Sequence, residues 1–363
     1  MPSAPVSKPE ELTAAALLRI KVDEPERLFP PSAEEIKRIY RLLAKIWHPD
    51  YNKSPEAKDV FTHLNQLHEK AEEKLANNNW AEPGFFSYKL KDGKTLRVPS
   101  DVRREFDDGL GTMHIGPTTI TYVVGRANED LFQNAIQQIR GITFLDNDQR
   151  PDTKIEKTLK RCLPTDFKTY ETDDAFILTI RKKPDDILLR DLLPLLPGDK
   201  RAAHIAWIMS RMHQMVRYLD HTGITHNAIT LDTVFVSPRE HSIGLFGGWW
   251  YAARYGAVLS SVPAEATEFL PNTGGKPILA YGKIDREMIR AAGREMLGDR
   301  GGTRLLMSKA APQPMIDYLR LLSSGDAQKD FTEWYQNVLP KSFGARRFTE
   351  LHVNYSDVYQ PGG

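Results

Sequence analysis

The sequence predicts a multidomain protein in which an all-α helical hairpin precedes a larger α+β, two-lobed (bilobal) fold. The chain has 363 residues, which is enough for two or three separate hydrophobic cores. Apolar residues recur with helical spacing up to about residue 76, and strand-like runs replace them from residue 85. Helical spacing returns after about residue 186, so we expect a β-rich part followed by an α-rich part.

We divide the chain into six segments at these changes of pattern. They are an N-terminal extension (1–23), a helical domain (24–76), a linker (77–84), a β-rich lobe (85–186), an α-rich lobe (187–355) and a tail (356–363). The linker is assigned to the polar run NNNWAEPG, because its asparagines, proline and glycine favour a loop.

The composition narrows the classes of function. The formal net charge is +1, so the chain as a whole is not drawn to nucleic acid or membranes. No apolar run reaches the roughly 18–20 residues that a membrane-spanning helix needs, and the start lacks the order of a signal peptide. The single cysteine, Cys162, excludes an internal disulfide and fits a reducing compartment. We therefore expect a cytoplasmic protein.

The first strong helix signal is the stretch SAEEIKRIYRLLAKIW. Ser32 is a good N-cap, and Glu35 three residues later makes a capping box. The apolar stripe of the helix consists of Ile36, Tyr40, Leu43 and Trp47. The other faces carry the cations Lys37, Arg38, Arg41 and Lys45. These cations have no exposed aromatics among them, which argues against nucleic-acid binding.

A second helix is predicted for SPEAKDVFTHLNQLHEKAEEKLA, with Ser54 as its cap and Pro55 at the first helical position. Its apolar face consists of Ala57, Val60, Phe61, Leu64, Leu67 and Ala71. The loop between the two helices is short, so they are expected to form an antiparallel hairpin.

The loop of this hairpin begins with His48-Pro49-Asp50. Pro49 ends the first helix, and Asp50 then projects beside the cationic helix. A carboxylate in this place can form a charge-assisted pair with an arginine of a partner. The cationic side chains can meet an acidic partner surface and steer association.

The stretch LFPPSAEEIKRIYRLLAKIWHPDYN resembles part of helix I, helix II and the loop of a J-domain, and AKDVFTHLNQL is similar to helix III of that family. The resemblance covers about residues 24–76. It departs from the family at EPERLFPP, which is short and lacks the usual tyrosine pair. The resemblance implies that the partner is a DnaK-type chaperone ATPase, whose hydrolysis the J-domain stimulates. The contact would be made by His48, Pro49, Asp50, Lys37, Arg38, Arg41 and Lys45.

Beyond residue 84 the chain predicts a small sheet with one helix. FFSYKLKDGKTLRV reads as two strands around an Asp-Gly turn, and residues 118–124 and 174–181 are further β-rich runs. NEDLFQNAIQQIRGI between these runs is helical. A long helix over AAHIAWIMSRMHQMVRYLDHTG follows, ended by Gly223, and then come short strands in DTVFVS and HSIGLFG.

Residues 223–248, GITHNAITLDTVFVSPREHSIGLFGG, resemble the catalytic and metal-binding segments of the protein-kinase fold. VPAEATEFLP resembles the end of an activation segment, and KIDREMIRAAGREMLG resembles the buried helix after it, with Asp285 as the anchoring acid. With the β-rich lobe, the resemblance spans about residues 85–355.

The charged groups that phosphoryl transfer needs are missing from the matching positions. His226 of the catalytic loop remains, but Ala228 stands at the position of the base and Thr233 at that of the metal-binding asparagine. Thr121 aligns with the phosphate-pairing lysine, and the helix after it offers no acid to pair with that lysine. Phe246, Gly247 and Gly248 stand where Asp-Phe-Gly is expected. Because this chemistry is mostly electrostatic, we expect a pseudokinase rather than an enzyme.

Other candidate sites are weaker. The loop DDGLGTMHIG has Gly109 and Gly111 but His114 in place of the third glycine, so a plain turn is favoured over a phosphate cradle. No histidine pair has metal-ligand spacing, and we expect no metal and no cofactor. The aromatic stretch GLFGGWWYAARYG suits packing against the α-rich lobe, with a ligand wall or a partner face as alternatives.

The favoured function is that of a J-domain co-chaperone whose pseudokinase domain selects a protein client or partner. Two alternatives stand beside it. One is an atypical protein kinase or nucleotide-binding phosphotransferase that uses a displaced acid such as Asp232, although this residue lies one position early for the metal role. The other is a structural scaffold in which both units are interaction folds.

Overall fold

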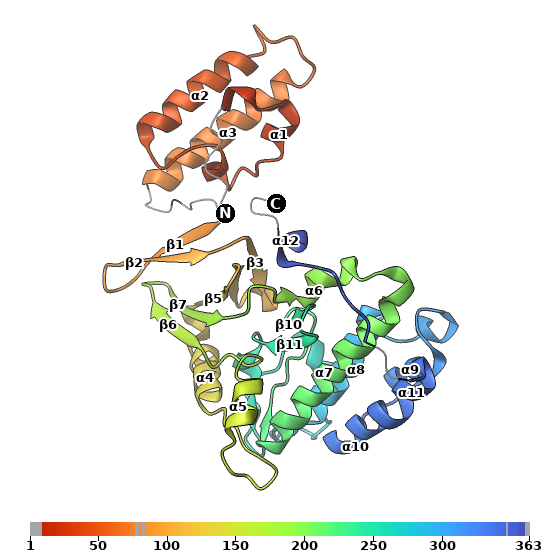
Figure 1. The fold of residues 1–363 in the computed structure, drawn as a ribbon. Helices are drawn as coiled ribbons and strands as arrows, with labels where there is room; N and C mark the ends of the chain where they lie inside the picture. Colours follow the sequence, from red (N-terminus) through yellow and green to blue (C-terminus); the bar gives the residue numbers. More distant parts are fainter. Residues whose placement is uncertain (1–8, 77–79, 81–83, 346–347, 360–363) are drawn as a thin grey trace.

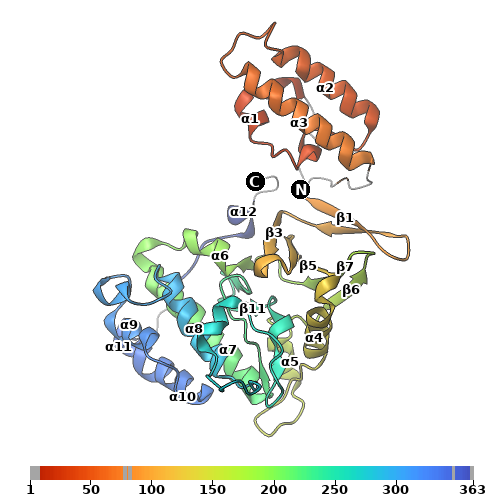
Figure 2. The same ribbon diagram turned by 180° about the vertical axis from the view of Figure 1, so that it is seen from behind.

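The computed structural model describes residues 9–76, 80, 84–345 and 348–359. Figure 1 shows a helical domain at one end of the molecule, the β1–β2 hairpin beside it, and then a sheet and a large helical lobe. The view from behind in Figure 2 gives the same order. Among the described residues, no helix combines the length and apolarity needed to cross a membrane.

The helical domain contains α1 (Ala14–Leu18), α2 (Ala33–Trp47) and α3 (Ala57–Ala76), with a 3-10 turn at Pro25–Arg27. The predicted hairpin is the α2–α3 pair. Ser32 caps α2 as predicted, since its hydroxyl accepts a hydrogen bond from the Glu35 N–H at 3.5 Å. The reciprocal half of the capping box is replaced, because the Glu35 carboxylate binds Arg38 at 2.8 Å instead.

The start of α3 differs from the prediction. The helix begins at Ala57, whose N–H donates to the Ser54 carbonyl at 3.1 Å. The Ser54 hydroxyl is buried without a hydrogen-bond partner among the described residues, so it does not cap the helix. The turn that includes Pro55 precedes the first α-helical hydrogen bonds, which explains the later start.

The predicted N-terminal extension also needs correction. Leu17 of α1 and Ile20 are buried in the same hydrophobic cluster as Leu28, Phe29 and the apolar faces of α2 and α3. Leu17 and Ile20 thus add to the core that the short, proline-flanked segment EPERLFPP shares with α2 and α3. The helical domain therefore begins before residue 24. Most of the predicted linker, 77–79 and 81–83, lies outside the described residues.

The β-rich lobe contains a separate hairpin and a five-stranded antiparallel sheet in the order β3-β4-β5-β7-β6. The hairpin strands are β1 (Phe85–Lys89) and β2 (Thr95–Pro99), joined as predicted through Gly93 at φ +82°. The sheet strands are β3 (Val102–Phe106), β4 (Gly111–Ile115), β5 (Thr119–Gly125), β6 (Phe167–Glu171) and β7 (Ala175–Arg181).

The predicted helix of this lobe is α4 (Glu129–Arg140), and its Phe132 stacks on Phe176 of β7 with ring centroids 5.1 Å apart. A second helix, α5 (Thr153–Leu159), was not predicted. Asp152 caps α5 by accepting from the N–H groups of Lys154 at 2.6 Å and Ile155 at 3.0 Å.

The α-rich lobe is built around two long buried helices, α7 (Arg201–His221) and α8 (Lys283–Met296). Gly223 follows α7 at φ +72°, as expected for a helix terminator. The short strands are β8 (Ile187–Leu188), β9 (Ile224–Thr225), β10 (Val234–Ser237), β11 (Ser242–Leu245) and β12 (Ala253–Arg254). The remaining helices are α6 (Leu189–Leu192), α9 (Gln313–Arg320), α10 (Ala327–Thr332), α11 (Leu339–Phe343) and α12 (Tyr355–Val358), with a π-helical turn at Glu333–Val338.

One hydrophobic cluster runs through both lobes, from the sheet and α4 to α7, α8 and α9. Tyr359, which follows α12, is 3% exposed and belongs to this cluster, so the predicted tail from residue 356 is part of the domain up to residue 359. The cleft between the lobes is lined by residues of β3, β4 and β5 on one side and by the β9–β10 loop on the other.

Candidate functional site

The loop after α2 has a compact, well-bonded geometry. His48 ends the helix in an extended conformation, and its carbonyl accepts from the N–H groups of Tyr51 at 3.0 Å and Asn52 at 2.8 Å. The Asn52 side-chain amide donates to the Ile46 carbonyl at 3.0 Å, which ties the loop back to the helix. These bonds give Pro49 and Asp50 one defined position.

Asp50 is presented outward from this loop. Its side chain is 79% exposed, and its oxygen Oδ2 lies 3.6 Å from Nδ1 of His48. The His48 ring packs edge-on against Phe61 of α3, with centroids 4.9 Å apart. His48 therefore joins the loop to the second helix, while the Asp50 carboxylate remains accessible to a partner.

All four predicted cations of α2 are exposed. Lys37, Arg41 and Lys45 follow one another at intervals of four residues, so they form one row along the helix. Arg38 differs from them because its guanidinium is already paired with Glu35. The row ends at Lys45, five residues before the exposed Asp50.

The second predicted site lies in the cleft between the lobes. Asp285 at the start of α8 is buried and accepts from the backbone N–H groups of His226 at 2.8 Å and Asn227 at 2.6 Å. Burial raises the pKa of Asp285 to about 6, against these hydrogen bonds, which lower it. His226 lies 3.0 Å through Nε2 from the Gly247 carbonyl, and burial lowers its pKa to about 3. Asp285 is thus the anchoring acid that the sequence predicted.

Two threonines of the loop after His226 form hydrogen bonds within the loop. The Thr233 hydroxyl donates to the Ala228 carbonyl at 2.6 Å and accepts from the Thr230 N–H at 3.0 Å. Ala228 is buried, so the position predicted for the base holds only a methyl group that faces the interior. The two hydrogen bonds of the Thr233 hydroxyl therefore close the loop on itself.

Two of the predicted cleft positions, Thr121 and Phe246, do not line the cavity. Thr121 of β5 is buried with its hydroxyl 3.0 Å from that of Thr179 on β7, whereas Tyr122 lines the cleft. Phe246 is buried against Phe235, with centroids 5.8 Å apart, whereas Gly247 and Gly248 line the cleft. Tyr122 lines the cavity and Thr121 does not, because neighbouring side chains of a strand point to opposite faces of the sheet.

Aromatic side chains meet in the cleft. Phe106 of β3, Tyr122 of β5 and Trp250 contact one another, with centroid separations of 4.9 to 5.2 Å. The Trp250 indole N–H donates to Asp107 at 2.6 Å. The cleft retains a cavity of about 570 Å³ beside this cluster. Sequence reasoning missed this role of Trp250, although the aromatic stretch that contains it left a ligand wall open as an alternative.

Helix α4 contacts the segment after Gly248 through the side-chain amide of Asn134. The Asn134 side chain donates to the carbonyls of Trp250 at 2.9 Å and Ala252 at 3.0 Å, and it accepts from Gln138 at 3.2 Å. These bonds attach α4 to the turn after Gly248. An amide in this place orients backbone, whereas an ion pair with a lysine would require a carboxylate.

The predicted turn in the segment 107–116 is confirmed only at its start, because residues from Gly111 to Ile115 form strand β4. Asp107–Gly109 forms a 3-10 turn between β3 and β4. A Cβ atom on Gly111 would lie 2.0 Å from the Val123 carbonyl oxygen, so strand packing explains this glycine. His114 is buried in β4 and lies 2.6 Å from the Tyr88 hydroxyl and 2.8 Å from that of Ser100.

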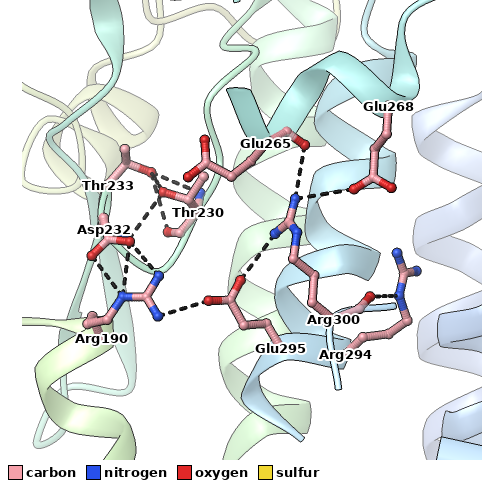
Figure 3. A network of polar contacts seen from close by, with 9 residues as sticks. All are labelled: Arg190, Thr230, Asp232, Thr233, Glu265, Glu268, Arg294, Glu295 and Arg300. Carbon is pink, nitrogen blue, oxygen red and sulfur yellow. Dashed lines mark hydrogen bonds and ion pairs between the residues drawn. The ribbon is translucent and has the colours of Figure 1, made fainter. Parts of the chain in front are cut away.

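Asp232, the displaced acid of the alternative function, is held in an ion-pair network (Figure 3). The Arg190 guanidinium lies 2.5 Å from its Oδ2 and also binds Glu295 at 2.9 Å. The Arg300 guanidinium forms ion pairs with Glu295 at 3.1 Å and with Glu268 at 3.4 Å. Within the described part of the chain, no group of three or more His, Cys, Asp or Glu side chains is placed to hold a metal ion.

Residues 29–74 match the family model of the DnaJ domain. The chain therefore carries a J-domain, and the loop that presents Asp50 belongs to it. A segment of 48 residues is 44% identical to Chaperone protein DnaJ of Thermosynechococcus vestitus, and it covers 13% of this chain and 13% of that protein. A segment of 35 residues is 54% identical to Chaperone protein DnaJ 2 of Thermus thermophilus, and it covers 10% of this chain and 12% of that protein.

Solved structures similar to the chain include vaccinia related kinase 3, with 15% identity, a TM-score of 0.45 and coverage of 72% of this chain and 93% of that one. ROP2 from Toxoplasma gondii, described as a virulence factor with a protein-kinase fold and no enzymatic activity, has 16% identity, a TM-score of 0.43 and coverage of 75% and 93%. In the chain itself, a five-stranded antiparallel sheet with α4 precedes a helical lobe whose Asp285 anchors the β9–β10 loop. The described residues from 84 onward thus form a two-lobed domain after the J-domain, with the order of sheet, helix and helical lobe that the sequence resemblance to the protein-kinase fold predicts.

Proposed function

We propose that the protein is a J-domain co-chaperone that recruits a DnaK-type chaperone and stimulates its ATPase. The observation that carries the proposal is the loop that holds Asp50 outward, 79% exposed, at the end of a helix with a row of three exposed cations. The curated relatives matched by this segment are named as DnaJ chaperone proteins, and the match covers only about an eighth of each.

The surface fits such a partner through opposite charges at two points. The Asp50 carboxylate can accept a bidentate pair from an arginine of the ATPase. Lys37, Arg41 and Lys45 can meet carboxylates of the same partner, and this contact speeds encounter more than it adds affinity. These groups act on the partner's catalytic cycle, so the J-domain itself performs no chemistry.

For the kinase-like domain we propose a role in choosing the client or the location, without phosphoryl transfer. Ala228 and Gly247 carry no charged group, and the Thr233 hydroxyl closes its own loop. Asp232, on which the alternative phosphotransferase function depends, is neutralised by Arg190. With a single cysteine, Cys162, the whole protein suits the reducing cytoplasm.

The proposal is tested by measuring ATP hydrolysis by a cognate DnaK-type chaperone with and without the full-length protein. The wild type is expected to raise the rate, whereas His48→Gln and Asp50→Asn lose the stimulation while the chain remains folded. Glu69→Gln is the matched control, because Glu69 is an exposed carboxylate on α3. An unchanged rate with the wild type, or full stimulation by Asp50→Asn, would contradict the proposal.

The cationic row is tested separately. Arg41→Glu is expected to slow association with the chaperone about tenfold at low salt, and the loss shrinks as salt rises because exposed charges are screened. Lys58→Glu, at an exposed position on α3, serves as the control. Phosphoryl transfer from ATP by the protein alone, in the presence of magnesium, would refute the pseudokinase part of the proposal. It would not affect the co-chaperone part.

A further inference from the structure

We propose that the cleft between the two lobes is a binding site for an organic cation, a guanidinium or an ammonium group. The cavity of about 570 Å³ lies within the range of small-molecule sites. Its lining combines aromatic rings with carboxylates, which is the chemistry that recognises cations. The same carboxylates would repel an anionic nucleotide.

The walls of the cavity are acidic. Glu105 and Asp107 lie on the β-rich side, and Asp232 and Glu265 lie on the α-rich side. Arg104 also lines the cavity, but its guanidinium is held by Asp191 at 2.8 and 3.0 Å. Arg190 offsets Asp232. The lining of the cavity thus holds four carboxylates and one arginine, and this arginine is paired with Asp191.

Glu265 supplies one of these carboxylates. Its backbone carbonyl, rather than its carboxylate, accepts from Arg300 at 2.9 Å. Figure 3 shows the carboxylate turned toward the side of Thr230, away from Arg300. The carboxylate therefore remains available to a cation in the cavity.

Tyr122 provides an independent indication of a ligand. The side chain is 1% exposed, and its hydroxyl has no hydrogen-bond partner among the described residues. The hydroxyl lies 2.8 Å from the point where a Cβ atom on Gly247 would stand, and both residues line the cavity. A buried hydroxyl without a partner costs free energy, and a donor from a ligand would recover it.

The aromatic cluster completes the site. Phe106 and Trp250 contact Tyr122 and line the cavity beside it. Asp107 accepts from the Trp250 indole, which fixes the orientation of the indole ring. Tyr122 and Trp250 are buried, so a guanidinium or ammonium group can contact the partly exposed Phe106 ring while its N–H groups donate to Tyr122 and Glu265.

The experiment titrates the full-length protein with agmatine, with a short arginine-containing peptide, and with ATP and magnesium, following tryptophan fluorescence and calorimetry. Saturable binding of agmatine or the peptide is expected, and no binding of ATP at this site. If the peptide binds tighter than agmatine, the cation belongs to a protein segment; the reverse order identifies a small molecule.

Two variants test the assignment. Glu265→Gln removes one charge and Tyr122→Phe removes one hydroxyl, and each is expected to weaken cation binding about fivefold to tenfold. Glu129→Gln, an exposed carboxylate on α4, leaves binding unchanged. Thermal unfolding confirms that the variants fold. The proposal is overturned if neither cation saturates, if Glu265→Gln binds as the wild type does, or if ATP displaces the cation. Chaperone ATPase stimulation is measured separately, so the two proposals fail independently.

Discussion

Three histidines of the kinase-like domain are buried in a neutral form. Burial lowers the pKa of His114, His213 and His226 to about 3 from the ordinary value of 6.5. Each lies within hydrogen-bond distance of a neutral group, and His213 lies 3.1 Å from the Tyr318 hydroxyl. None of these positions can take up a proton without losing stability in the folded state.

This predicts that the domain loses stability as the pH falls. The folded-state pKa lies below the unfolded one, so the contribution is complete above pH 6.5 and disappears as pH falls toward about 3. At pH 5 each histidine removes about 2 kcal/mol from the free energy of unfolding. Thermal unfolding measured from pH 7 to 5 checks this. His213→Gln should flatten the dependence, whereas His352→Gln, 84% exposed, should not. A pH profile identical in wild type and His213→Gln would contradict the prediction.

At the scale of elements, α8 is fitted closely to its neighbours. Asp285 at its start anchors the β9–β10 loop, and Gly293 faces α7 and α9. A Cβ atom on Gly293 would lie 2.5 Å from Leu319 and 2.7 Å from the Met209 sulfur. The glycine is thus explained by the closeness of three helices rather than by backbone conformation.

We therefore expect Gly293→Ala to destabilise the domain by about 1–3 kcal/mol, because overpacking outweighs the gain in helix propensity. Gly198→Ala is the control, since a Cβ atom there meets no atom within 4 Å. Chemical denaturation of the two variants provides the comparison. An increase in stability for Gly293→Ala would show that Met209 and Leu319 move aside without cost.

At the scale of the whole molecule, the end of the chain joins the two lobes. The Tyr359 hydroxyl accepts from the Leu188 N–H at 3.0 Å and donates to Asp191 at 2.8 Å. Asp191 also binds Arg104 of the sheet, and Tyr355 donates to Asp101 at 2.9 Å. The half-buried Asp191 carboxylate therefore connects the α-rich lobe, the sheet and Tyr359, which follows the last helix.

Tyr359→Phe keeps the ring and removes the hydroxyl, so it leaves the Leu188 N–H and one acceptor of Asp191 without this partner. We expect a loss of about 1–2 kcal/mol in the stability of the kinase-like domain. A double-mutant cycle with Arg104→Met should show coupling, because both side chains bind Asp191. Tyr51→Phe, at a residue 82% exposed in the J-domain, is the control. Strict additivity in the cycle would contradict the shared anchor.

Much of the fold could be predicted because local sequence patterns specify where helices and strands begin and end. The cap at Ser32, the turn at Gly93 and the end of α7 at Gly223 depend on neighbours in sequence. Helix α3 starts later than the sequence pattern predicts, because serine and proline are compatible with several kinds of turn. The role of Leu17 was missed because its burial depends on helices that follow it in the chain.

The sequence by itself determined the two kinds of domain, the exposed Asp50 loop and the absence of charge at Ala228 and Phe246. These follow from residue identity and short-range spacing. Only the tertiary structure decided that Tyr122 rather than Thr121 faces the cleft, and that Trp250 and Glu265 line it with Tyr122. The reason is physical: side-chain direction in a strand depends on register, and a cavity depends on segments that pack from distant parts of the chain.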